Sequence, residues 1–579
     1  MSTQVFGRIQ VVLATTIVVT LLMAACAPSA PSSPAPSAPA LSAPAAAPSQ
    51  PAATATPPPL PTPRVSVPVV AAPTPTPGTQ AQRGGILTIA NPDSPAHFDL
   101  QQGVRIDTSI PFRNVYSALL RRDPQETEKV IPELAESWSA SPDGLKYTFV
   151  LRKGVKWHDG QPLTTQDVAF SLMRMAHPPK GMTSPRGQSL LEGVVTARAL
   201  DDTRVEVTLG GTSSSFLSRV ATDWVVIMPR HTIEKYGDMK QVVNGSGPFK
   251  FVRYTPSVSV EMTRNEEYFA QGRPFVNGVT VYILPDAGTS FAALRTGRVL
   301  LSTVGSRAAT DAQLRIAQSD LSDKLTVERY QSFTRYILIP NQEVKPWGDI
   351  RVRRAVDLAI DRQAFEKLAL LGKMGGYFHP ETKWGFSRQE LLTQPGFRQP
   401  KDQDIAEAKK LLAEAGFASG VDTPLMCRRG EDCEIYSSAL KGQLEKVGVR
   451  LTLNPTEAVT MDQKFAKGEF SVSIFPLGVL QDDPDQLIFE QYVTTGTRNH
   501  ARFSDPQIDA LATEQARTLD ESKRRALVRK IDERLVNAHV YPSILWLDYV
   551  RVYSKSVRGF RNGPGLWTDQ NMEYVWLAK

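Results

Sequence analysis

One stretch of the chain, from residue 27 to about residue 83, has a composition that cannot form a folded core, so the folded part of the protein must follow it. It consists mainly of Pro, Ala, Ser and Thr and has almost nothing to bury. Such a composition does not offset the entropy lost on folding, so we expect a disordered tether with polyproline character. A glycosylated, mucin-like stalk is the alternative. The folded body therefore spans residues 84–579, which is long enough for two or three structural units.

The residues before the tether have the order of a secretory signal. Arg8 gives a short basic segment, an apolar run covers residues 11–23, and small residues precede Cys26. This run is too short for a permanent membrane span. Residues 22–26 resemble a bacterial lipobox, apart from Met23 at a position that usually holds Leu. We therefore expect a signal peptide over residues 1–25 and a lipidated Cys26; an ordinary signal peptide with an incidental cysteine is the alternative.

A lipid at Cys26 would be the chain's only attachment to a membrane. Each buried methylene of an acyl chain contributes roughly 0.8 kcal/mol, so two or three chains anchor a soluble domain stably. No later stretch reaches the ~18 consecutive apolar residues that a spanning helix requires. We therefore expect residues 26–83 to be a lipidated tether between the membrane and the folded body.

The charge balance and the cysteines exclude some partners. A net charge of +7 is modest for 579 residues, and acidic and basic side chains alternate along segments such as 520–537, so we expect no nucleic-acid partner. Apart from Cys26, the chain has only Cys427 and Cys433. In an exported protein such a close pair predicts a local disulfide. A zinc site is the alternative, but no histidine is near the pair in sequence, and we expect no metal ion.

The folded body alternates short strands with amphipathic helices. Apolar residues alternate at 147, 149 and 151, at 205, 207 and 209, and at Val258, Val260 and Met262, which predicts half-buried strands. Such a mixture over this length indicates an α/β or α+β fold.

Four polar residues predict helix starts. Thr164 is followed three residues later by Asp167, as in a capping box. Asp349 precedes a helix that we expect to bury Val352, Val356, Ala359 and Ile360 and to expose Arg351, Arg353 and Arg354. Ser504, with Pro506 just inside, and Asp520 begin two further helices.

Several ordered segments resemble one known family, the dipeptide/oligopeptide/nickel-type (family 5) solute-binding proteins of ABC importers. The strongest block runs through residues 132–138, 143–149, 151–160 and 163–168. Further matches are residues 83–89, 114–120, 245–249, 350–355 and 408–417. The likeness covers essentially all of residues 84–579.

The resemblance implies an α/β fold with two lobes that close on a ligand, the type II periplasmic-binding-protein clamp. Lobe one would span residues 84–330, with an extra subdomain over about 116–228. Lobe two would span residues 331–540, and residues 541–579 would return to lobe one. Two strands, which cross near Val327 and Tyr541, would form the hinge.

The resemblance also implies a function. The chain would be an extracytoplasmic lipoprotein on the outer face of the cytoplasmic membrane. It would capture a peptide-like or other organic solute and deliver it to an ABC permease and its ATPase, as a monomer without a cofactor. A sensing or interaction protein that uses the same clamp without transport is the alternative.

An enzyme is not indicated by the sequence. His158 and Asp159 suggest proton transfer, but the family places them in a structural turn. Asp482, Asp483 and Asp485 lack the glycine and the closing Glu of a calcium loop, and Pro484 favours a turn. The sequence also shows no paired nucleophile and base, so no residues support the interpretation as a hydrolase.

The ligand-binding residues follow from position in the family. Residues 104–107 would be extended and pair with the ligand. A lobe-two Asp binds the amino group of peptides in the family, and counting back from Asp483 places Leu480 there. A buried ammonium without a countercharge is disfavoured by several kcal/mol, which argues against a free-amine peptide unless Asp482 substitutes. A sugar, a blocked peptide or an opine-like solute stays open.

Aromatic and basic side chains complete the expected site. An aromatic residue is more often core than pocket, and Arg105 or Arg335 would pair a ligand carboxylate or be an exposed charge. The residues that we expect to bind the ligand are Val104, Arg105, Ile106, Phe333, Tyr377, Trp384, Phe475, Leu477, Gly478, Leu480 and Asp482.

Overall fold

The computed structural model describes most of the body of the chain. It covers residues 81–103, 106–123, 126, 129–302, 309–369, 371–479, 482–561 and 572–579. The expected signal peptide, Cys26 and nearly all of the tether lie outside the described residues. Within the described residues, no helix combines the length and the apolar character that crossing a membrane requires.

Two four-stranded sheets come from the first half of the body. The first has the order β1 (Ile86–Asn91), β12 (Gly278–Ile283), β11 (Ser259–Arg264) and β10 (Phe249–Thr255). The second has the order β5 (Ala135–Ala140), β6 (Lys146–Leu151), β8 (Arg204–Leu209) and β7 (Val194–Ala199). Both sheets share one hydrophobic core, which also holds Val557, Met572 and Val575. The last described residues therefore pack with the first half of the body.

A six-stranded sheet lies in the second half. Its order is β14 (Gly372–Lys373), β18 (Ser543–Ser554), β13 (Leu325–Pro340), β17 (Val472–Gly478), β15 (Val421–Arg428) and β16 (Val449–Thr456). Strand β15 pairs in parallel with β16 and β17, whereas β13 pairs antiparallel with β17 and β18. Two further apolar clusters cover this sheet.

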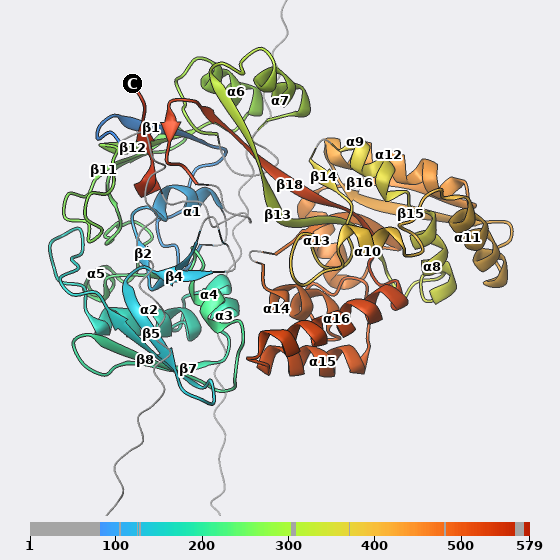
Figure 1. Cartoon of the computed structure of the whole chain (residues 1–579), viewed down its shortest axis with the longest axis horizontal. Coiled ribbons are helices and arrows are strands. Elements are labelled where there is room, and N and C mark those ends of the chain that lie inside the picture. The colour runs from blue at the N-terminus through green and yellow to red at the C-terminus, as the bar shows by residue number, and fades with distance from the viewer. Residues whose placement is uncertain are drawn as a thin grey trace, which may run out of the picture. The chain divides into compact units, whose positions relative to one another are not determined.

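Strands β13 and β18 are long and lie side by side (Figure 1). Their pairing runs from Leu325 opposite Ser554 to Ile337 opposite Ser543. Leu325 packs with Ala90 and Leu294, close to strand β1, whereas Ile337 packs in the second half of the body. These two strands therefore connect the two halves, and the domain boundaries proposed from the family stay a prediction.

Short helices and strands complete the described chain. The helices of the first half are α1 (Ile106–Phe112), α2 (Thr165–Ala176), α3 (Pro185–Leu190), α4 (Phe216–Val220), α5 (Arg230–Tyr236), α6 (Ala287–Arg295) and α7 (Asp311–Gln318). Those of the second half are α8 (Ile350–Ala359), α9 (Arg362–Leu368), α10 (Arg388–Leu392), α11 (Asp402–Glu414), α12 (Glu431–Glu445), α13 (Ala458–Lys467), α14 (Pro484–Leu487), α15 (Pro506–Arg517) and α16 (Glu521–Ala538). A π-helix, Ile488–Tyr492, follows α14, and a 3-10 turn spans Met572–Tyr574. Two-stranded pairs are β2 (Ser117–Ala118) with β9 (Val226–Ile227), β3 (Leu120–Arg122) with β4 (Val130–Pro132), and β19 (Val557–Arg558) with β20 (Trp576–Leu577).

Most local predictions are confirmed. Strands β6 and β8 alternate buried and half-buried residues as expected. Helix α2 begins with a capping box, in which Thr164 and Asp167 each accept from the other's backbone N–H. Asp349 and Asp520 accept from backbone amides at the starts of α8 and α16. Local hydrogen bonds within four residues decide these starts, so the sequence reveals them.

Three local predictions are wrong in detail. Helix α15 is capped by Asp505, whose carboxylate accepts from the Gln507 N–H, and not by Ser504. Val258 precedes strand β11 and is exposed. Arg353 is buried, because its guanidinium donates to the carbonyls of Trp347, Gly348 and Ala538 and so satisfies backbone acceptors inside the second half.

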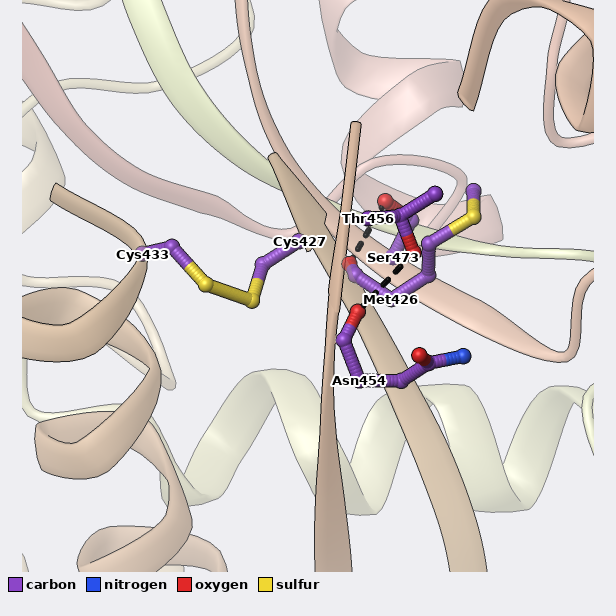
Figure 2. Close-up of a disulfide and its surroundings, with 6 residues drawn as sticks. All are labelled: Met426, Cys427, Cys433, Asn454, Thr456 and Ser473. Carbon is purple, nitrogen blue, oxygen red and sulfur yellow. Dashed lines mark hydrogen bonds between the residues drawn. A yellow bond between two sulfur atoms is a disulfide. The ribbon is translucent and has the colours of Figure 1, made fainter. Parts of the chain in front are cut away.

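The disulfide favoured by the sequence is present. Cys427 of β15 is bonded to Cys433 of α12, and both residues are buried. Figure 2 shows the bond near Ser473, whose hydroxyl donates to the Met426 carbonyl at 2.9 Å. The bond therefore ties a helix to the parallel part of the six-stranded sheet.

Candidate ligand-binding site

A small cavity lies where β13, β18 and the loop before α14 meet. Its volume is about 20 Å³, which is room for one water-sized group. Its wall includes Phe333 from β13, Trp546 from β18, His379, Trp384, Asp482 and Asp483. Three residues expected at the ligand site, Phe333, Trp384 and Asp482, therefore share one wall.

A bulge in β13 brings Phe333 to this wall. Gln331 pairs with Asp548 and Thr334 with Leu547, so two residues of β13 lie between partners that are neighbours on β18. Ser332 stabilises the bulge, since its hydroxyl donates to the Leu547 carbonyl at 2.6 Å and accepts from the Thr334 N–H at 3.1 Å. Bulges redirect side chains in this way.

Trp384 and Asp482 contact each other through the backbone. The indole Nε1–H of Trp384 donates to the Asp482 carbonyl at 3.4 Å. The guanidinium carbon of Arg524 lies 5.0 Å from the centre of the Trp384 ring, within range of a cation–π interaction. Trp384 is therefore fixed from two sides, and its ring forms a rigid part of the wall.

The acidic segment leads into helix α14, so the turn favoured at Pro484 is instead the start of a one-turn helix. Asp483 caps α14 by accepting from the Asp485 N–H at 3.0 Å. Arg524 donates to Asp483 at 2.7 and 3.0 Å and to Asp485 at 3.0 Å. Burial lowers the pKa of Arg524, but the two carboxylates raise it by more. Asp483 and Asp485 are therefore held by a side chain of α16.

His379 is a residue of this wall that the sequence analysis missed. It is 3% exposed, and its ring lies edge-on to Trp546, with centroids 5.0 Å apart. Its Nδ1 accepts from the Glu381 N–H at 3.2 Å and lies 2.9 Å from Gln331 Nε2. Burial, with a smaller effect of the nearby Lys373, lowers the pKa of the His379 ring to about 3, so the ring is neutral at neutral pH.

Other predicted residues lie beside this cavity without lining it. Tyr377 is buried, and its hydroxyl accepts from the Tyr541 N–H at 3.2 Å. Phe475 is half-buried, with its ring centre 5.3 Å from that of Phe465. Leu477 is buried next to Gly478. These three side chains are part of the same apolar cluster as Phe333 and Trp384.

Arg335 is neither exposed nor in the cavity wall. It is fully buried among the rings of Tyr377, Tyr492 and Trp546, and donates to the Gln491 side chain and the Tyr492 hydroxyl. The expectation of an exposed charge is therefore wrong. Its aromatic partners come from segments that are distant in the sequence, which is why the sequence did not indicate its burial.

Three expected residues lie outside the described residues, namely Val104, Arg105 and Leu480. Ile106 begins helix α1, so the extended backbone expected over residues 104–107 is wrong at its second half. Pro111 lies inside this short helix. A proline is unfavourable inside a helix, so the sequence pattern did not indicate one.

His158 and Asp159 do not pair with each other. The His158 ring nitrogen Nε2 lies 3.0 Å from the Gly247 carbonyl, whereas Asp159 pairs with His231 at 2.7 Å and accepts from Asn244. Across the described residues, no group of three or more His, Cys, Asp and Glu side chains is arranged for a metal ion. The two residues therefore hold a turn together, as the family implied.

A larger cavity of about 540 Å³ lies between α8, α11 and α16. Of the expected ligand-binding residues that the structure describes, only Tyr377 contributes to it. Its guanidinium groups are already neutralised, since Arg351 pairs with Asp349, Arg354 with Glu407 and Arg362 with Asp357. The smaller cavity is therefore the stronger candidate for the ligand site.

Comparison with solved structures shows the fold. The ABC transporter-associated periplasmic binding protein DppA from Helicobacter pylori, in complex with the peptide STSA, matches with a TM-score of 0.70 at 22% identity. The match covers 86% of this chain and 99% of that chain. The fold is the two-lobed α/β clamp of periplasmic binding proteins, with an extra subdomain in lobe one.

The family follows from the sequence. Residues 129–499 match the family of bacterial extracellular solute-binding proteins, family 5 Middle, and the chain belongs to it. Heme-binding protein A of Haemophilus influenzae is 27% identical over 451 residues, 72% of this chain and 79% of that protein. Probable di/tripeptide-binding protein 5 of Pseudomonas aeruginosa is 25% identical over 517 residues, 83% of this chain and 93% of that protein.

Proposed function

We propose that this chain captures an organic solute outside the cytoplasmic membrane and delivers it to an ABC permease and its ATPase. The lipid on Cys26 and the tether of residues 26–83 would keep the folded body near the permease. The protein would act as a monomer, with the solute enclosed between its lobes.

The observation that carries this proposal is the common wall formed by Phe333, Trp384 and Asp482 beside the connecting strands. Ligand sites of this kind combine apolar walls with a few placed polar groups. The cavity lies beside the two strands that connect the halves, and in a clamp a ligand that contacts both lobes favours the closed form over the open one. The names of the relatives, which include heme-binding and di/tripeptide-binding proteins, support capture of an organic solute without fixing which one.

A thermal-shift screen tests the capture of a solute. The panel contains di- to pentapeptides, oligosaccharides and amino-acid conjugates. A ligand present at 100 times its dissociation constant stabilises the folded state by about 2.7 kcal/mol, which raises the melting temperature measurably. We expect one chemical class to raise it. A panel that leaves the melting temperature unchanged throughout would count against capture.

Anchoring and delivery need a second measurement. We expect the protein to fractionate with membranes and the Cys26→Ser variant to fractionate as soluble protein, because the variant lacks the acylated sulfur. Uptake of the captured solute by cells should require both this chain and a permease with its ATPase. Binding without any effect on uptake would favour a sensing protein instead.

A further inference from the structure

The protonation of His379 is determined by its surroundings. A backbone N–H can only donate, so the 3.2 Å contact from Glu381 makes Nδ1 of His379 an acceptor. The side-chain amide of Gln331 lies 2.9 Å from the same Nδ1 and donates to it in this arrangement. A neutral imidazole carries one proton, which must therefore be on Nε2. The tautomer with Nε2–H is fixed by two neighbours.

This Nε2–H is a buried donor in need of an acceptor. The residue is 3% exposed and lines the cavity of about 20 Å³, and Nε2 has no hydrogen-bond partner among the described residues. A buried donor without a partner is costly, so native proteins almost always satisfy such groups. A ring flip is not an alternative, because it would bring the Cδ2–H group, which cannot accept, to the Glu381 N–H and leave that donor without its acceptor.

The same geometry discriminates between ligand groups. An ammonium has only donors, so it would place N–H against N–H at His379. A carboxylate of the ligand would lie beside the acidic Asp482, which is on the same wall. A neutral acceptor oxygen meets neither objection.

We propose that the solute presents a neutral acceptor oxygen, such as the carbonyl of an acylated amine or a sugar oxygen, to the Nε2–H of His379. His379 is then a specificity residue in the wall of this cavity. This inference rests on the proposed function.

Three solutes and three variants test the proposal on the full chain. The solutes are tetra-alanine, its N-acetyl form and maltose, measured by titration calorimetry. His379→Phe keeps an aromatic ring against Trp546 and Phe333 but removes the N–H. His379→Gln keeps an N–H near the position of Nε2. His500→Phe is the matched control, because His500 is a half-buried ring, stacked on Phe465 with centroids 4.2 Å apart, and is not part of the cavity wall.

We expect acetyl-tetra-alanine or maltose to bind at least about tenfold more tightly than tetra-alanine. His379→Phe should weaken that binding about tenfold, whereas His379→Gln and His500→Phe should keep most of it. Tightest binding of the free amine by the unmodified chain would overturn the inference and make Asp482 the amine-binding residue. Unchanged affinity in His379→Phe would overturn it as well.

A second measurement separates this inference from the proposed function. Nitrogen NMR shifts of the histidine rings at neutral pH report which nitrogen of His379 carries the proton. An Nδ1–H ring overturns the inference whatever binds, and an Nε2–H ring supports it. If none of the three solutes binds, the proposed function loses support, and the tautomer alone decides whether His379 offers a donor.

Discussion

At the scale of single residues, Asp532 of α16 is an unusual carboxyl group. Its side chain is fully buried. Burial raises its pKa from 3.8 to about 8, although Arg529 and Arg335 oppose the shift. A raised pKa in the folded state means that folding favours the protonated form. The contribution to stability is therefore fully present below about pH 3.8 and is lost as the pH rises through about 8.

The Asp532→Asn variant should remove this dependence. Between these two pKa values the group lowers the free energy of unfolding by about 1.4 kcal/mol per pH unit, and a neutral amide does not titrate. We expect the melting temperature of the variant, relative to the unmodified chain, to be higher at pH 9 than at pH 5. Glu533→Gln, at the exposed neighbouring position, is the control and should give no such trend. An equal difference at both pH values would contradict the prediction.

Gly478 shows how one residue limits the pairing of β17 with β13. A Cβ at this position would lie 2.5 Å from Thr334 Oγ1, which is hydrogen-bonded to the Tyr549 hydroxyl at 2.7 Å. We expect Gly478→Ala to lower the free energy of unfolding by about 1–3 kcal/mol, because the strands must move apart. Denaturant titration measures this value.

Gly442 supplies the control for that substitution. It lies inside α12, and a Cβ there would meet no atom within 4 Å. Alanine is the better helix former, so Gly442→Ala should stabilise the protein by about 0.5–1 kcal/mol. Similar effects of the two substitutions on the free energy of unfolding would mean that the close contact with Thr334 does not destabilise Gly478→Ala.

At the scale of elements, the disulfide stabilises the connection between β15 and α12. The sequence separation of its cysteines is 6. Closing a loop of this size lowers the entropy of the unfolded chain by an amount worth roughly 2 kcal/mol. We expect the Cys427→Ala, Cys433→Ala double variant to lose about that much in denaturant titration. Addition of a reductant should shift the unmodified chain toward the variant and leave the variant unchanged.

Elements that depend on nearby residues could be predicted from the sequence. Thr164 and Asp167 contact each other within one turn, and the same holds for the caps at Asp349 and Asp520. Arg353 was misplaced because its partner carbonyl at Ala538 is distant in the chain. A helical pattern reveals which positions share a face, but not whether a guanidinium finds buried acceptors there.

The site was predictable only in part, for the same reason. Family position suggested Phe333, Trp384 and Asp482, which share the cavity wall. The contact between His379 and Trp546 could not be predicted, because it joins segments far apart in the sequence and depends on the pairing of β18 with β13. The isolated histidine next to Pro380 carried no periodic signal that would have marked it.

At the scale of the whole molecule, the end of the chain is fixed to the first half by a buried ion cluster. Glu573 is 1% exposed and accepts from Arg121 at 2.5 Å and from Arg273 at 3.2 Å. Burial raises the pKa of Glu573, but the two arginines lower it by more, to about 2. The carboxylate therefore stays ionised at neutral pH and keeps residues 572–579 in place.

Glu573→Ala should lower the free energy of unfolding by about 3–5 kcal/mol, because two arginines lose a buried counterion. The melting temperature measures the loss. Glu267→Ala breaks an exposed pair with Lys156 and should change it little. If the two variants melt at the same temperature, the buried cluster does not hold the chain end.

The bulge at Ser332 and Phe333 also limits how this protein can diversify. Side chains of a strand alternate between two faces, so adding or removing one residue reverses every following side chain. A deletion in β13 would turn Phe333 away from the cavity and at the same time shift the partners of β18 across the junction of the two halves. Insertions and deletions in this part of β13 would therefore disrupt the site and the pairing together. A new preference for solutes has to arise by substitution of single side chains.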